Sequence, residues 1–226
     1  MPAKNTISPA TPAASWPTAY VLRIELRELT PAIWREVWVA PDITLRKLHG
    51  VIQAAMGWHD CHLYGFGVPG RGRAAHFWGV PSLYRFEPRA ARDRMDLREP
   101  ANDDASTALS QVLRAPKDKL LYLYDFGDDW EHLITLQKIV TTPEPLPLLA
   151  RAAYTCPPES CGGVPGFLNL AQALHDPNHP EHADLRAWVD DAVARDWLPG
   201  ELDPAAFKAH ASAVARLRPR APLRRL

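Results

Sequence analysis

The chain has 226 residues, enough for one large domain or two small ones. Its 26 basic and 26 acidic residues cancel, so net charge does not single out a nucleic-acid-binding or membrane-binding protein. No apolar run approaches the length of a membrane span, and three cysteines, an odd number, argue against a secreted disulfide scaffold. We therefore expect a cytoplasmic protein that does not enter a membrane.

The chain opens with a segment that we expect to be a disordered leader. Residues 1–19 are rich in Pro, Ala, Ser and Thr and lack the apolar core of a signal peptide. Residues 20–28 then alternate between apolar and charged side chains, the pattern of a half-buried strand. Residues 33–39 form a second predicted strand, and the break at Thr30-Pro31 leads us to expect antiparallel pairing of the two.

A helix is predicted next, followed by a third strand. Thr44 or Asp42 can cap the helix, an apolar stripe runs to Met56, and Gly57 is a good stop. The following strand begins near His62. This β-β-α-β start, the hairpin described below and the helical C-terminal third predict an α+β fold with a mainly antiparallel sheet.

Residues 69–117 are predicted to be an irregular, arginine-rich insertion within a domain that spans residues 20–217. A short helix at 106–113, capped by Ser106, is the regular element expected there. Seven arginines fall within residues 71–98, and residues 218–226 form a basic tail. Both basic segments could contact the phosphates of nucleic acid, the alternative being solvated surface.

The stretch LLYLYDFGDDWEHLITL at 120–136 predicts a β-hairpin. A three-residue loop at 127–129 would place Tyr124 opposite His132 and give one continuous aromatic face. On the other face Asp125 and Glu131 would then be cross-strand neighbours, a repulsive arrangement unless a cation or solvent intervenes.

The acidic hairpin suggests a metal site for a hard cation such as Mg²⁺ or Mn²⁺, because such ions prefer oxygen ligands. A hydrolase or nuclease would use the metal to activate water. The alternative is structural: the turn aspartates bond nearby amides, and Asp125 pairs with Arg23 or Arg35. In this register His132 lies on the aromatic face, away from Asp125. The candidate residues are Asp125, Asp128, Asp129, Glu131 and His132.

A second candidate metal site lies in the C-terminal third, whose periodicity predicts helices around Phe167, Trp188 and Phe207. The ligand types there suit Zn²⁺, although the spacing of the cysteines is looser than in common zinc fingers. The alternative is a pair of reduced cysteines in a Pro-Gly loop, with histidines serving as turn and cap residues. The candidate ligands are Cys156, Cys161, His175, His179 and His182.

Four tryptophans are predicted to pack between the sheet and a helix or at the rim of the core. They are Trp34, Trp38, Trp58 and Trp130. Aromatic rings of this kind could instead stack on nucleic-acid bases if they were exposed beside basic side chains.

Three segments together resemble the plasmid pRiA4b ORF-three-like family. They are MGWHDCHLYGF at 56–66, LYLYDFGDDWEHLITL at 121–136 and YTCPPESCGGVPGF at 154–167, followed by HDPNHPEH at 175–182. The resemblance covers roughly residues 18–215, and it implies a compact α+β domain of plasmid or mobile-element origin. Some members of this family are labelled TnpR-like passenger proteins of insertion elements, although the family implies no established activity.

The TnpR-like label suggests a resolvase, which would need a nucleophilic serine within an arginine cluster. The candidate serines Ser82, Ser106 and Ser110 lie in an irregular segment without such a motif, and no helix-turn-helix is recognisable. We therefore expect a non-catalytic accessory domain that binds a partner such as nucleic acid. The alternative is a metal-dependent hydrolase or nuclease at the hairpin Asp125–His132.

Overall fold

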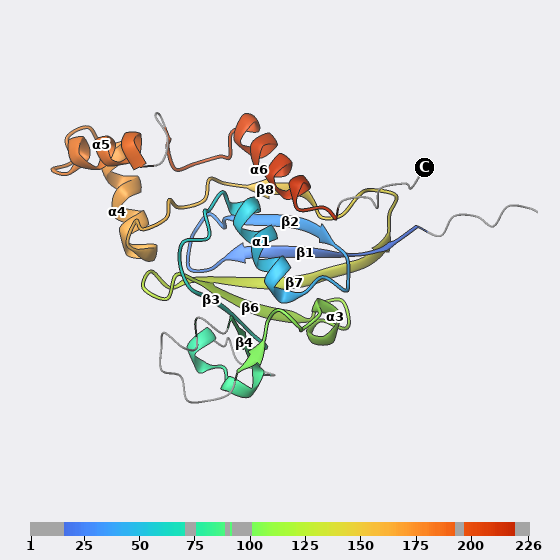
Figure 1. Ribbon diagram of the computed structural model, residues 1–226. Coiled ribbons are helices and arrows are strands. Elements are labelled where there is room, and N and C mark those ends of the chain that lie inside the picture. The colour runs from blue at the N-terminus through green and yellow to red at the C-terminus, as the bar shows by residue number, and fades with distance from the viewer. Residues whose placement is uncertain (1–15, 71–75, 89–90, 92–100, 193–196, 220–226) are drawn as a thin grey trace, which may run out of the picture.

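An eight-stranded sheet forms the centre of the protein in the computed structural model, which describes residues 16–70, 76–88, 91, 101–192 and 197–219 (Figure 1). The strands are β1 (Thr18–Leu26), β2 (Trp34–Val39), β3 (Tyr64–Gly67), β4 (Arg85–Glu87), β5 (Asn102–Asp103), β6 (Lys119–Tyr124), β7 (Trp130–Thr141) and β8 (Leu148–Ala153). Their order in the sheet is β5-β4-β3-β6-β7-β1-β2-β8. Neighbouring strands are antiparallel except β4 and β5, so the predicted mainly antiparallel α+β fold is confirmed.

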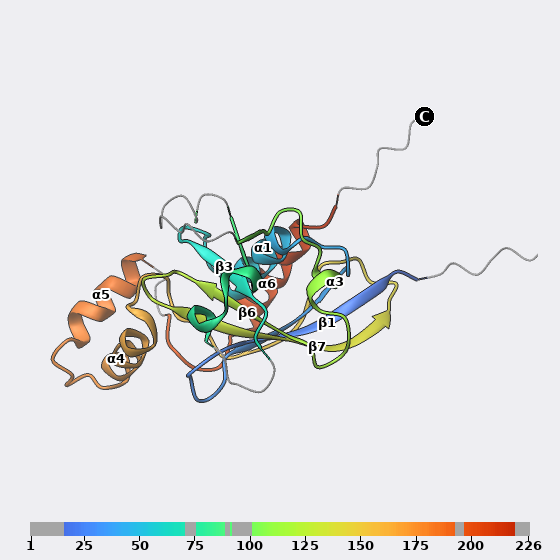
Figure 2. The same cartoon turned by 90° about the horizontal axis from the view of Figure 1, so that it is seen from below.

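The longer helices lie at the sheet surface or beyond one end of it. They are α1 (Leu45–Met56), α4 (Gly163–His175), α5 (His182–Ala192) and α6 (Pro204–Arg216), with a short α3 (Leu109–Val112) and two 3₁₀ turns, η1 (Phe77–Gly79) and η2 (Ser82–Tyr84). Helices α1 and α6 lie on the same side of the sheet, whereas α4 and α5 project beyond its end (Figures 1 and 2). No helix in the described ranges is both long enough and apolar enough to cross a membrane.

The two faces of the sheet differ because side chains alternate along each strand. On the side of α1 and α6, the apolar residues of β1 predicted to point inward are buried, as the alternation in the sequence required. The antiparallel pairing of β1 with β2 is also confirmed. The other side of β1, β2, β7 and β8, which we call the outer sheet face, carries Arg23, Trp34 and Trp38, all partly exposed. Trp34 and Trp38 therefore lie outside the core, whereas Trp58 and Trp130 are buried in it.

Helix α1 begins and ends where the sequence predicted. The side chain of Thr44 accepts a hydrogen bond from the Lys47 amide, and Gly57 ends the helix in the left-handed region with φ 89°. A side chain at position 57 would also place its Cβ 2.7 Å from Nε2 of His210, which lies on α6. Glycine therefore serves both the chain reversal and the close packing of α6 against the end of α1.

The hairpin exists, but its predicted register is wrong by two residues. The loop comprises the five residues 125–129, so Tyr124 pairs with Trp130 and Tyr122 with His132. Glu131 is opposite Leu123 and not opposite Asp125. A shift by two residues keeps every side chain on its predicted face, so Tyr122, Tyr124, Trp130 and Ile134 are buried together as expected. Phe126, in contrast, leaves the strand and packs near Trp78.

Two further elements differ from expectation or fall outside the described residues. The helix predicted at 106–113 is shorter: it is α3, preceded by Ala108, and the Ser106 hydroxyl donates to the Asp103 carbonyl. Of the seven arginines within 71–98, Arg85 lies in the described ranges, in β4; the other six, the leader up to residue 15 and the tail beyond Pro219 do not. The helix beginning at Asp203-Pro204 is confirmed, with Asp203 accepting from the Ala205 amide at 2.7 Å.

A buried arginine connects the sheet, α1 and the segment after β8. Arg35 points from β2 to the helix side and is 0% exposed. Its guanidinium donates to the carbonyls of Ala55 (2.8 Å), Trp34 (2.9 Å), Ala153 and Tyr154 (both 3.1 Å). Within the described ranges it forms no ion pair with a carboxylate, and burial lowers its pKa. The partial negative charge of the α1 C-terminal carbonyls favours a cation at this position.

We predict that Arg35→Met destabilises the fold strongly. The substitution leaves buried carbonyl oxygens without donors, each costing about 1–3 kcal/mol, so the free energy of unfolding should fall by about 3 kcal/mol or more. Urea unfolding at neutral pH measures it. Arg23→Met, on the outer sheet face, is the matched control and should change stability by less than about 1 kcal/mol. Equal effects of the two substitutions would refute a structural role for Arg35.

Candidate functional site

Three loops meet at one end of the sheet, and hydrogen bonds of side chains join them to one another. They are the 57–63 loop between α1 and β3, the 125–129 hairpin loop, and the 154–162 loop before α4. Trp58 anchors the first loop: its Nε1 donates to the Pro157 carbonyl at 2.9 Å, and its ring stacks on Tyr124 with centroids 4.9 Å apart. The three loops are far apart in sequence, so any site here is created by the fold.

Glu159 holds the 154–162 loop against the other two. The Tyr124 hydroxyl donates to its Oε1, while the backbone amide of His59 (3.1 Å) and His59 Nδ1 (3.0 Å) contact Oε2. Burial alone would raise the pKa of Glu159, but these hydrogen bonds hold it below its ordinary value. Glu159 is therefore an ionised anchor whose acceptor sites are largely occupied.

Four residues of the first loop, α1 and β6 form a closed ring of hydrogen bonds, in which Asp60 donates through its backbone amide and accepts through its carboxylate. The Asp60 amide donates to Gln53 Oε1 (2.9 Å), so Gln53 Nε2 donates to the Tyr122 oxygen (3.0 Å). The Tyr122 hydroxyl then donates to His49 Nδ1 (2.8 Å), and His49 Nε2 donates to Asp60 Oδ1 (2.7 Å). Burial lowers the pKa of His49 despite the nearby Asp60 carboxylate, which favours the neutral imidazole that this ring requires. With both nitrogens engaged, His49 has no lone pair left to act as a general base.

A buried carboxylate, Asp104, extends this polar network toward the surface. Asp104 is fully buried and accepts from the Tyr64 hydroxyl at 2.5 Å. Its other oxygen pairs with the half-exposed Arg46 at 2.8 Å. The His49 ring stacks on Tyr64, with centroids 3.5 Å apart, which joins the two networks.

The predicted acidic residues of the hairpin act as connectors to separate segments. Asp125 Oδ1 accepts from the Gly127 amide (3.0 Å) within the turn. Asp128 accepts from the Gly162 amide (3.1 Å), and Asp129 accepts from Trp78 Nε1 (2.9 Å). Glu131 pairs with Arg27 and accepts from the Phe77 amide (2.7 Å).

The partner predicted for Asp125 is wrong. Neither Arg23 nor Arg35 pairs with it: Arg23 pairs with Glu25, and Arg35 bonds carbonyls. Its neighbour is His62, whose Nε2 lies 3.5 Å from Asp125 Oδ2. Sequence could not anticipate this, because the contact depends on the pairing of β3 with β6, two strands that are far apart in the chain.

Ser160, His62 and Asp125 come together, but not in the geometry of a catalytic triad. Ser160 has φ 60°, and its Oγ lies 3.3 Å from His62 Nε2. Asp125 approaches the same nitrogen. A triad needs the serine and the carboxylate on opposite nitrogens of the imidazole, so that one orients the ring while the other delivers its proton. The three residues instead join the three loops.

His132 is fully buried in the core. It is 0% exposed, its Nδ1 donates to the Trp130 carbonyl at 2.9 Å, and burial lowers its pKa to about 4. His132 is therefore neutral at physiological pH and lies on the aromatic face, as expected from the hairpin pattern.

The residues proposed for zinc are held in other contacts. Burial raises the pKa of Cys156 and of Cys161 to about 12, so both thiols are protonated at neutral pH. His182 Nδ1 bonds the Ala173 carbonyl at 2.6 Å, and His179 Nδ1 accepts from the Glu181 amide. His175 lies in the last turn of α4.

Across the described ranges, no three His, Cys, Asp or Glu side chains are grouped so that they could hold a metal ion. This applies to the hairpin set, to the cysteine–histidine set, and to the exposed Cys61, whose thiol pKa is raised by burial and by Glu159. The chemistry that this site supports is hydrogen bonding between loops.

The comparisons with known proteins agree with the motifs that these three loops carry. A family model described as plasmid pRiA4b ORF-3-like protein matches residues 18–210. The chain belongs to this family. "Uncharacterized protein y4hQ" of Sinorhizobium fredii is 35% identical over 168 residues, which are 74% of this chain and 78% of that protein. The crystal structure of a protein of unknown function, MM3350 from Methanosarcina mazei Go1, matches with a TM-score of 0.68 and 27% identity, covering 84% of this chain and 98% of that one.

These relatives of the plasmid pRiA4b ORF-3-like family are uncharacterised proteins, and their names indicate no activity. Sequence reasoning missed His49, Asp60, Asp104 and Glu159, which hold the networks together. Each finds its side-chain partner beyond its own secondary-structure element. A local pattern contains no signal for such pairs; for Asp60 and Glu159 the one hint was the clustering of polar residues within the family motifs, and His49 and Asp104 lie outside those motifs.

We predict that the burial of neutral His132 makes the protein less stable in acid. The pKa is about 4 in the folded protein and 6.5 ordinarily, so between these values the unfolded chain binds more protons. The contribution of neutral His132 to the free energy of unfolding is fully present above about pH 6.5 and is lost as the pH falls toward 4. Near pH 5 the free energy of unfolding should change by about 1 kcal/mol per pH unit. His132→Gln should remove this part of the slope, as measured by urea unfolding between pH 4 and 7. The same slope in both proteins would contradict the assignment.

A second prediction concerns Glu159 as the anchor of the 154–162 loop. Glu159→Ala removes the acceptor of the Tyr124 hydroxyl and of the His59 amide, so the 57–63 loop should lose protection. Hydrogen exchange should rise by about tenfold or more at the His59 amide, equivalent to about 1.4 kcal/mol. Glu144→Ala, on the β7–β8 connection, is the control and should leave that amide unchanged. Unaltered exchange in Glu159→Ala would show that Trp58 alone holds the loop.

Proposed function

We propose that the protein is a non-catalytic binding domain, an accessory protein of plasmid or mobile-element origin that works in the cytoplasm, and that its partner is nucleic acid. The proposed contact surface is the outer sheet face, on the side of β1, β2, β7 and β8 opposite α1 and α6 (Figure 2). A sheet face with exposed aromatic rings can stack unpaired bases, as other nucleic-acid-binding sheets do.

One observation carries this proposal: two guanidinium groups, one from each strand that neighbours β2, lie near the ring of Trp34. Arg23, from β1, lies 4.4 Å from the centre of the Trp34 ring, and Arg151, from β8, lies 6.0 Å from it. Each guanidinium is held by a carboxylate of the same face, Arg23 by Glu25 at 2.7 Å and Arg151 by Glu36. The indole and both cations are thereby positioned before any ligand arrives, which lowers the entropy that binding would cost.

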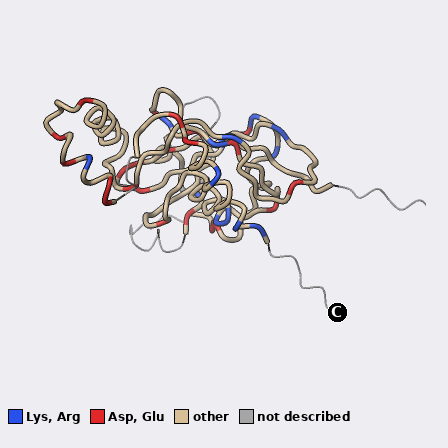
Figure 3. The backbone as a smooth tube through the Cα atoms, turned by 90° about the horizontal axis from the view of Figure 1, so that it is seen from above, with Lys and Arg blue, Asp and Glu red and all other residues tan. Residues whose placement is uncertain are grey.

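The neighbouring residues extend this surface along the strand. Trp38 lies two positions beyond Glu36 on the same face and donates to it from Nε1 at 3.2 Å. Lys138 of β7 acts electrostatically on Glu36, so a third cation is close. Alternating rings and cations suit a single strand whose bases stack while its phosphates pair with Arg and Lys. Basic and acidic positions are interspersed over the body (Figure 3), so we expect moderate, salt-sensitive affinity.

The alternative, a metal-dependent hydrolase or nuclease at the hairpin Asp125–His132, has less support. The contacts of Asp125, Asp128, Asp129 and Glu131 cross-link loops, and His132 is buried. Resolvase activity is disfavoured for the reason given by the sequence, the lack of a serine within an arginine cluster. A contribution from the arginine-rich residues 71–98 and the basic tail is part of the proposal, although most of both segments lies outside the described residues.

The proposal predicts that the protein binds single-stranded oligonucleotides in a salt-dependent way. Fluorescence anisotropy with labelled poly-dT and poly-U at about 50 and 200 mM salt should show clear weakening at the higher salt. Trp34→Ala and Trp38→Ala should each weaken binding by about tenfold, because stacking contributes about 1–3 kcal/mol per base.

Trp78→Ala is the matched control, since Trp78 is exposed but lies on η1, and it should leave affinity unchanged. No binding, or equal losses in all three variants, would overturn the outer-face assignment. Cleavage of the oligonucleotide in Mn²⁺, abolished by Asp125→Ala, would favour the hydrolase alternative.

A further inference from the structure

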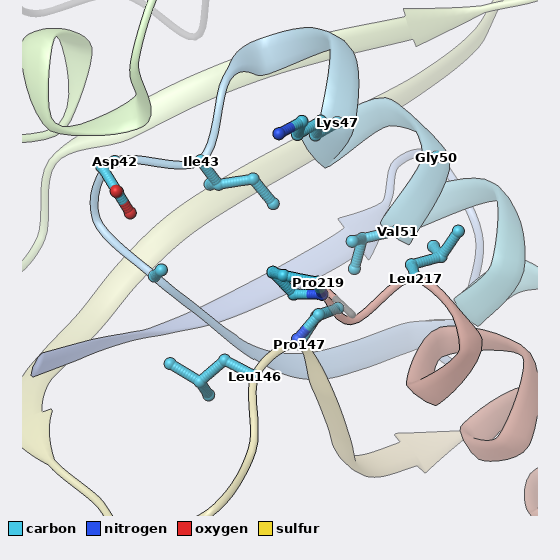
Figure 4. A pocket seen from close by; sticks show the side chains of 10 residues that line it. Asp42, Ile43, Lys47, Gly50, Val51, Leu146, Pro147, Leu217 and Pro219 are labelled. Atoms are coloured by element: carbon cyan, nitrogen blue, oxygen red, sulfur yellow. The ribbon is translucent and has the colours of Figure 1, made fainter. Parts of the chain in front are cut away.

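A second surface, on the opposite side of the sheet, has the form of a small-molecule site. An apolar groove of about 380 Å³ lies between the first half of α1, the β2–α1 and β7–β8 connections, and the residues that follow α6 (Figure 4). Its apolar walls come from four separated segments and include Ile43, Val51, Leu146, Pro147, Leu217 and Pro219. This volume lies within the range that small-molecule pockets occupy.

A glycine in the middle of α1 keeps the floor of the groove open. Gly50 lines the groove, and a Cβ built at this position would meet no atom within 4 Å. Glycine in a helix interior costs about 1 kcal/mol relative to alanine, so α1 would be more stable with a side chain there. Packing against the rest of the protein does not require this glycine.

The wall formed by the segment after α6 is fixed in place. Arg218 Nε donates to the Pro147 carbonyl at 3.1 Å, which ties this segment to the β7–β8 connection. Leu217 and Pro219, on either side of Arg218, both face the groove (Figure 4). The groove is therefore bounded on both sides.

One negative and one positive side chain lie at the same end of the groove. Asp42 and Lys47 are at the end near Ile43, whereas Val51 and Leu217 are at the other (Figure 4). Both charged side chains are exposed, and within the described ranges neither forms an ion pair, with the other or with a third residue. The groove thus combines an apolar body with two unpaired charges of opposite sign at one end.

We propose that this groove binds a free α-amino acid with an apolar side chain. Its carboxylate would pair with Lys47, its ammonium group with Asp42, and its side chain would lie over Gly50 between Val51 and Pro147. A ligand with an apolar group and a carboxylate alone would leave Asp42 unpaired, and a ligand with an apolar group and an amine alone would leave Lys47 unpaired. A zwitterion is therefore the charge-complementary ligand. The groove lies on the helix side, apart from the outer sheet face, so this site stands independently of nucleic-acid binding.

Calorimetric titration of the full chain with L-phenylalanine tests the proposal. We expect a dissociation constant near or below about 1 mM, with binding at least about tenfold weaker for 3-phenylpropionate, phenethylamine and glycine. These three compounds lack the ammonium group, the carboxylate and the apolar side chain respectively. Equal affinity for phenylalanine and either monovalent analogue, or no binding of phenylalanine, would overturn the assignment.

Variants distinguish a loss of phenylalanine binding from a loss of folded protein. Asp42→Asn and Lys47→Gln should each weaken phenylalanine binding about tenfold and bring its affinity close to that of the corresponding analogue. Gly50→Leu should raise the unfolding temperature and abolish binding, because its side chain fills the floor. Gly50→Ala, the matched control, should raise the unfolding temperature while retaining most of the affinity. Unchanged binding in Gly50→Leu would place the ligand elsewhere and refute the proposal.

Discussion

The guanidinium of Arg35 is the contact on which the arrangement of the other parts depends. It satisfies carbonyl oxygens of β2, of the last turn of α1 and of the end of β8, three segments that no other single side chain joins among the described residues. These acceptors are neutral, so burial of the charged guanidinium costs solvation free energy that no described carboxylate compensates. The partial negative charge at the C-terminus of α1 offsets part of this cost. The outcome is that α1 ends at a fixed place above the sheet. The start of the 57–63 loop, which follows α1, is therefore fixed relative to the sheet.

That placement explains why the three loops of the family motifs form one unit. Trp58 enters the core directly after α1 and meets Tyr124 of the hairpin, while Glu159 closes the third loop over both. Gly163 permits a close approach of the third loop to the hairpin, since a Cβ there would lie 2.5 Å from the Asp128 carbonyl oxygen. The polar residues of the motifs thus hold the three loops together, and the two ligand surfaces proposed above, the outer sheet face and the groove beside α1, are built from other residues.

Much of this fold follows from local patterns in the sequence, and what does not follow is long-range. The alternation of apolar and charged residues predicted β1, and the capping residues predicted both ends of α1, because these signals act over a few residues. The hairpin register was wrong because loop length is set by the left-handed conformations of Asp125 and Asp129, which a sequence permits but does not dictate. The buried face was nevertheless predicted correctly, because side chains on a strand return to the same face every two residues and the register error was two residues. The contacts of Glu159 with Tyr124, and of Asp104 with Tyr64, join residues 35 and 40 positions apart, and no local rule pairs them.

The ring formed by Asp60, Gln53, Tyr122 and His49 has a consequence for how this site can vary. Each member is both a donor and an acceptor, and all four hydrogen bonds run in the same rotational sense, so each bond polarises the next. Loss of one member leaves its two neighbours in the ring without a partner and weakens the remaining bonds, so the four act as one cooperative unit. Energies of single substitutions within the ring will not add, and a change at one position is tolerated best when a second accompanies it. A substitution at any one of these four positions therefore acts on the whole ring, whatever ligand the neighbouring surfaces bind.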